Sequence, residues 1–144
     1  MKNINVNAAY EEYNINGKIV IRFNPLDSEF VKRFIAAAEA LADRQEKFGN
    51  DVQNVEPDGF FAISEQTNAD MREIINGLFG EDVCTPIWGT MHLTALSEGL
   101  PIWCDLMLAL MDEIHEAMSA KKQKIESNPR LDKYLAKYQK KSGK

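Results

Sequence analysis

Alternating apolar residues near the start of the chain predict a β-hairpin. In the segment KIVIRF, residues 18–23, Ile19, Ile21 and Phe23 alternate with Lys18, Val20 and Arg22, a two-residue period typical of a strand with one buried face. The pair Asn16-Gly17 precedes this segment, and both residue types tolerate the positive φ angles of a tight hairpin turn. We therefore expect strands at about residues 10–15 and 18–23, with room for an extra strand at residues 2–8.

A period near 3.6 residues then predicts three long helices. The first runs from about residue 27 to 48, after Asn24-Pro25, which suits the start of a helix. The second runs from about residue 64 to 78 and ends near Gly77 and Gly80. The third begins at Leu100-Pro101 and extends to about residue 123.

The segments between and after these helices complete the predicted fold. Residues 49–59 are polar and bounded by glycines, which indicates a loop, and residues 90–97 are expected to form one or two helical turns. A short helix, RLDKYLAKYQ, should follow Asn128-Pro129. We predict a mainly helical α+β fold in which the N-terminal hairpin packs on three or four helices. Residues 1–128 would form one globular domain, and residues 129–144 a basic C-terminal helix with a frayed end.

The sequence GLFGEDVCTPIWG, residues 77–89, raises three interpretations for its cysteine: a nucleophile, half of a metal site, or a small apolar residue in a bend. Cys84, His92, Cys104 and His115 are too widely spaced for a structural zinc site, whose ligands come in close pairs. A nucleophilic thiol needs a lowered pKa and a base such as His92. The acidic residues just before Cys84 would raise its pKa instead.

We therefore interpret this segment as a structural hinge with an inert cysteine and expect neither a metal nor a cofactor. The glycines and the proline would shape the bend while the aromatic residues and the thiol dock into the core; the residues concerned are Phe79, Gly80, Cys84, Pro86, Trp88 and Gly89. The chain also contains no phosphate-binding, dinucleotide-binding or H-E-x-x-H motif. These observations favour a protein that is not an enzyme.

Composition and charge narrow the class of protein. Hydrophobic residues make up 44% of the 144 residues and charged residues 27%, as in ordinary globular proteins. Residues 1–118 hold 8 Lys/Arg and 20 Asp/Glu, a balance of −12, whereas residues 119–144 hold 9 and 2, a balance of +7. The basic tail could meet an anionic partner, fold back on the acidic body, or simply remain solvated. Nucleic acid is not the expected partner, because the body would repel it.

No apolar run is long enough to span a membrane, and the first residues lack a long apolar stretch, so we expect a cytoplasmic protein. The third predicted helix carries a wider apolar stripe than one buried face requires. Such a stripe is either central to the core or presents a second apolar surface to a partner, and flexible methionines suit such a surface. The candidate partner-binding residues are Trp103, Met107, Leu110, Met111, Ile114 and Met118.

Several short motifs together resemble a known family. INGKIVIRFNPLDSEFVKRF near the start, IINGLFGEDVCTPIWG in the middle, an apolar helix and a basic end occur in this order. The chain is similar to the small tail-assembly-chaperone-like proteins of long-tailed phages and prophages of Gram-positive bacteria. Phe79-Gly80 and Trp88-Gly89 stand where that family has its aromatic-glycine turns.

The resemblance implies a non-catalytic protein that binds the hydrophobic helical tape-measure protein during tail assembly, in the cytoplasm of the host cell. Tail tube subunits are further candidate partners. A homo-oligomer would be compatible with this role. Two other interpretations stay open: a structural virion component, such as a tail tube or connector protein whose hairpin pairs edge to edge, and a cysteine-dependent enzyme around Cys84.

Overall fold

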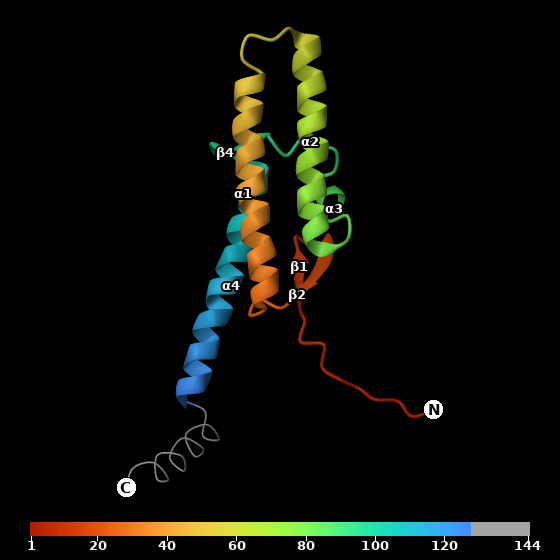
Figure 1. The fold of residues 1–144 in the computed structure, drawn as a ribbon, viewed down its shortest axis with the longest axis vertical. Coiled ribbons are helices and arrows are strands. Elements are labelled where there is room, and N and C mark those ends of the chain that lie inside the picture. Colours follow the sequence, from red (N-terminus) through yellow and green to blue (C-terminus); the bar gives the residue numbers. More distant parts are fainter. Residues whose placement is uncertain (128–144) are drawn as a thin grey trace.

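The computed structural model describes the backbone of residues 1–127 and the side chains of residues 1–120 (Figure 1). The predicted short helix after Asn128-Pro129 and the predicted separate tail segment, residues 129–144, lie outside the described residues.

Two long antiparallel helices, α1 (Ser28–Asp51) and α2 (Pro57–Phe79), lie side by side and form the frame of the fold (Figure 1). Asp27 caps α1, because its Oδ1 accepts a hydrogen bond from the N–H of Glu29 at 3.0 Å. The carboxylate of Glu29 lies in the first turn, where the helix dipole favours negative charge. Both predicted helices are confirmed, and α2 starts earlier than predicted.

The predicted loop at residues 49–59 is wrong at both ends, since α1 reaches Asp51 and α2 begins at Pro57. Proline suits the first position of a helix because its missing N–H would have no partner there. One turn later, Phe60 meets Phe48 of α1 with ring centroids 6.2 Å apart. The two helices therefore meet at a segment whose composition indicates a loop.

The N-terminal hairpin is confirmed in its two strands and in its turn. β1 (Glu11–Ile15) pairs antiparallel with β2 (Ile19–Phe23), and the turn residues Asn16 and Gly17 have φ angles of 55° and 68°. Residues 2–8 form no strand and are exposed to solvent, so the expectation of an extra strand there is wrong.

After α2 the chain forms a one-turn helix, α3 (Cys84–Trp88), and a small hairpin of β3 (Leu96–Ser97) and β4 (Leu100–Pro101). The helical turns predicted at residues 90–97 are therefore wrong. Glu98 and Gly99 have φ angles of 53° and 84°, which is the conformation of a two-residue hairpin turn. A right-handed helix cannot include residues in this conformation. The third predicted helix is confirmed as α4 (Ile102–Ser127).

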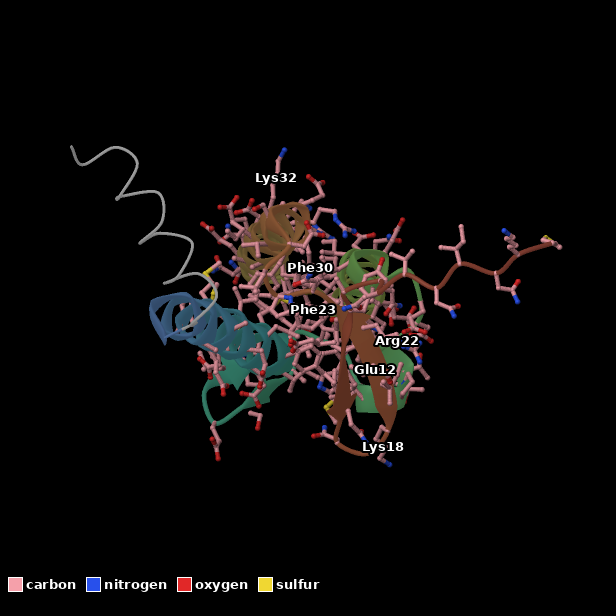
Figure 2. The ribbon with its side chains drawn as sticks, turned by 90° about the horizontal axis from the view of Figure 1, so that it is seen from below. Glu12, Lys18, Arg22, Phe23, Phe30 and Lys32 are labelled. Carbon is pink, nitrogen blue, oxygen red and sulfur yellow. The ribbon has the colours of Figure 1, made fainter. Side chains whose placement is uncertain are left out.

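The core lies where the β1–β2 hairpin meets α1, α2 and α4. Phe23 stacks on Tyr13 and on Phe30, with ring centroids 4.5 Å apart in both pairs. Figure 2, the view from below, shows Phe23 and Phe30 close together between the hairpin and the helices, while Lys32 points away from the body. The predicted α+β fold, a hairpin packed on helices, is confirmed. Other fully buried side chains include Ile21, Phe34, Leu41, Met71, Ile75, Val83 and Leu93.

Candidate functional site

The segment predicted as a hinge forms a bend between α2 and α3. Gly80 ends α2 at φ 71° and Gly89 ends α3 at φ 60°, conformations that side chains disfavour. Cys84 is completely buried at the start of α3, which also contains Pro86. Phe79 and Trp88 are partly buried and pack against the core.

Polar side chains on α2 hold this bend in place. The Oδ1 of Asn76 accepts hydrogen bonds from the N–H groups of Val83 and Cys84, at 2.9 and 3.2 Å. Its Nδ2 donates to Asp82 Oδ1 at 3.2 Å, and the same oxygen accepts from the N–H of Thr85 at 3.1 Å. Hydrogen bonds from the Thr85 side chain and N–H lower the pKa of Asp82, so this carboxylate beside the start of α3 is stabilised in its charged form.

Two further residues of α2 fasten the chain beyond the bend. Arg72 donates from Nη2 to the carbonyl oxygens of Gly89 and Met91, at 2.7 and 2.6 Å, and Asn68 Oδ1 accepts from the N–H of Leu93 at 3.0 Å. Asn68, Arg72 and Asn76 are four residues apart and so share one face of the helix. Sequence reasoning missed this clamp, although the regular spacing of its polar residues is visible in the sequence.

The environment of Cys84 opposes a nucleophilic role. Burial raises the pKa of its thiol to about 12, against a smaller opposing effect of the nearby Arg72 guanidinium. The thiol is therefore protonated at neutral pH, whereas a nucleophilic cysteine reacts as the thiolate. Burial, and then the charge of Asp105, also raise the pKa of Cys104.

The four residues considered as metal ligands are not assembled into a site. In the described part of the chain, no three His, Cys, Asp or Glu side chains are grouped so that they could hold a metal ion.

The six candidate partner-binding residues of α4 divide into two sets. Trp103, Met107, Leu110 and Ile114 are buried, with at most 8% of their surface exposed, so they belong to the core and the expectation that they form a partner surface is wrong for this structure. The stripe is wide because α4 packs on two neighbours: Trp103 Nε1 donates to Gln45 Oε1 of α1 at 3.1 Å, and Leu110 lies beside the β1–β2 hairpin. Met111 is half-buried, and Met118 remains 46% exposed.

Met118 forms one wall of a groove between α4 and the start of α1. We call this depression, of about 360 Å³, the α1–α4 groove; it is lined by Leu26, Ser28, Val31, Lys32, Ile35 and Met118. Leu26 is 40% exposed and Ile35 is 45% exposed, so three large apolar side chains from two segments surround one concavity. Figure 1 shows that α4 diverges from α1 toward the lower end of the molecule.

Comparisons with protein-family models, with curated protein sequences and with solved structures find no match to this chain. Among the described residues, no helix combines the length and the apolar character that crossing a bilayer requires.

Proposed function

We propose that this chain is a non-catalytic binding protein that shelters an apolar helical segment of a partner in the α1–α4 groove. The observation that carries the proposal is the grouping of Leu26, Ile35 and Met118, each 40–46% exposed, around a single concavity. Exposed apolar residues scattered singly need no explanation, but apolar residues gathered in a groove between helices are typical of sites that accept the apolar face of a partner helix.

The dimensions of the groove limit what it can hold. Ser28 and Ile35 both line the groove and are seven positions apart on α1, which corresponds to about 10 Å along the helix, or about two turns of a partner. Covering three half-exposed apolar side chains would contribute roughly 1 kcal/mol each, because full burial of such a side chain is worth about 1.5–3 kcal/mol. A contact of this size favours reversible binding, which a protein that later releases its partner requires.

The chemistry of the lining favours a partner with an apolar, variable surface. Met118 has a flexible thioether that adapts to different side chains. Among the described residues, Lys32 is the charged residue of the lining, and its side chain points away from the body in Figure 2. The family resemblance makes the tape-measure protein of a long-tailed phage the partner we propose, with tail tube subunits as further partners and the host cell cytoplasm as the place of assembly.

The alternative of a cysteine-dependent enzyme receives no support from the site. Such an enzyme requires an accessible thiolate, but Cys84 is completely buried and burial raises its pKa to about 12.

Co-expression with the tape-measure protein of a long-tailed phage tests the proposal. We expect the wild-type chain to keep that protein soluble and to co-purify with it, and the Ile35→Glu variant to co-purify about tenfold less, because a carboxylate in the groove would lose its water on binding. Leu108→Glu is the matched control, since Leu108 lies on α4, is 55% exposed and does not line the groove.

Equal recovery with Ile35→Glu and with the wild-type chain would contradict the groove as the binding site. Failure of the wild-type chain to bind would contradict the proposal as a whole. Detection of the polypeptide in finished phage particles would favour the structural virion component instead.

A further inference from the structure

A second concavity lies on the opposite side of α4 from the groove. It has a volume of about 420 Å³ and lies between α4, α3 and the tip of the β1–β2 hairpin. Ala109 lines this concavity and Met118 lines the α1–α4 groove, and nine residues along a helix correspond to a rotation of about 180°. The two concavities are therefore separate sites, and this one, which we call the acidic cleft, is within the size range of small-ligand pockets.

The walls of the acidic cleft combine aromatic, apolar and acidic groups. Tyr13 of β1 and Trp88 of α3 provide aromatic rings, and Leu106 and Leu110 of α4, both buried, provide an apolar floor. Aromatic faces attract cations through the negative potential of the ring, and apolar walls accept the stem on which a cation is carried.

Two carboxylates, those of Asp105 and Glu113, lie in the same lining. No lysine, arginine or histidine of the described residues lines the cleft, and neither carboxylate belongs to an ion pair within that part of the chain. Two negative charges without a counter-charge beside aromatic rings favour a cationic ligand.

The tyrosine in the cleft reports the same negative surroundings. Burial raises the pKa of Tyr13, and its hydrogen bond to Glu11 together with the charges of Glu11, Glu113 and Glu116 raises it further. The Tyr13 hydroxyl donates to Glu11 Oε2 at 2.9 Å, so a third carboxylate lies close to the ring. Each of these negative charges disfavours a bound anion and favours a bound cation beside the Tyr13 ring.

We infer that the acidic cleft binds an organic cation, namely an alkylammonium or guanidinium group carried on an apolar stem. The charged group lies against the aromatic rings, in a lining that contains the carboxylates of Asp105 and Glu113, and the stem lies on the leucine floor. A lysine or arginine side chain of another polypeptide and a free amine share this chemistry. The inference goes beyond the proposed binding of an apolar helix and does not depend on it, because it concerns the other side of α4.

NMR titration of the full chain tests this inference. Three probes are compared: n-butylamine, an acetylated pentapeptide with a central lysine between two leucines, and the same peptide with norleucine in place of lysine. We expect the two cations to shift the backbone amides of Asn14, Asn16 and Ala109, which line the cleft. Tighter binding of the lysine peptide would identify a polypeptide side chain as the ligand, and equal affinities would identify a free amine.

Charge variants connect the binding to the carboxylates. Asp105→Asn combined with Glu113→Gln should weaken the binding of either cation about tenfold, since each partly exposed ion pair contributes a few-fold. Asp43→Asn with Glu46→Gln is the control, because both residues are exposed on α1, do not line the cleft, and change the net charge equally. The inference is overturned if both double variants bind the cations alike, or if the norleucine peptide shifts the same amides as strongly.

Discussion

Two parts of α4 differ in the exposure of their side chains, although both carry large apolar residues. The buried part extends up to Ile114, and the exposed part is the following turn with Met118. Leu110 and Ile114 are at most 3% exposed, whereas Met118, one turn further along, is 46% exposed. The difference arises from the neighbours of the helix. Trp103 in the first turn of α4 donates to Gln45 of α1, and Leu110 lines a concavity together with the β1–β2 hairpin. Further along, α4 diverges from α1 (Figure 1). An apolar stripe thus indicates that a face of the helix is to be buried. The fold determines which turns of that face are buried within this chain and which remain exposed.

This comparison separates two roles within one helix. Residues of the buried part should contribute to stability and resist chemical access, whereas residues of the exposed part should contribute little to stability and remain available to a partner.

The largest expected effect is on the rate at which a reagent modifies the buried thiol of Cys84, compared with an exposed thiol. In the Cys104→Ser variant, Cys84 is the remaining thiol. We expect a disulfide reagent at pH 7 to modify it about 1,000-fold more slowly than a free peptide cysteine. A pKa of about 12 lowers the thiolate fraction by roughly that factor, compared with a pKa near 8.5–9. The rate should rise with pH without a plateau below pH 10, whereas the peptide levels off above about pH 9. A rate similar to that of the peptide would show that the interior around Cys84 is accessible.

Truncation of one side chain in each part of α4 sharpens the comparison further. Leu110→Ala should lower the free energy of unfolding by about 2–5 kcal/mol, because it leaves a cavity in the core. Met118→Ala should change it by less than about 0.5 kcal/mol, as is usual for exposed positions. Chemical denaturation of both variants measures the two values, and similar losses would contradict the division of the helix.

The sequence predicted those elements that local residues determine. Asn16-Gly17 sets the hairpin turn, and the acidic residue in the first turn of α1 favours a helix start there. The helix begins a few residues after the expected Asn24-Pro25 start, because Asp27 and not Asn24 is its cap. The early start of α2 brings Phe60 against Phe48 of α1, a contact between residues twelve positions apart that the polar composition of the segment does not indicate.

The candidate site was less predictable for the same reason. The periodicity of α4 indicates an apolar face, but its partition into core and groove depends on where α1 begins and in which direction α4 leaves it. The stripe therefore pointed to Trp103 and Met107, which are buried, as well as to Met118, which lines the groove. The groove residues Leu26 and Ile35 lie on a different segment, and no pattern within α4 could identify them.

The most direct test of the account is the NMR signal of the Met118 methyl group in the full chain while a peptide from an apolar helix of the tape-measure protein is added. Met91 provides an internal control, because it is 52% exposed and lies outside the groove. We predict that the Met118 signal shifts progressively and saturates while the Met91 signal stays in place. Saturable binding that leaves Met118 unchanged would contradict the claim that the α1–α4 groove holds the partner.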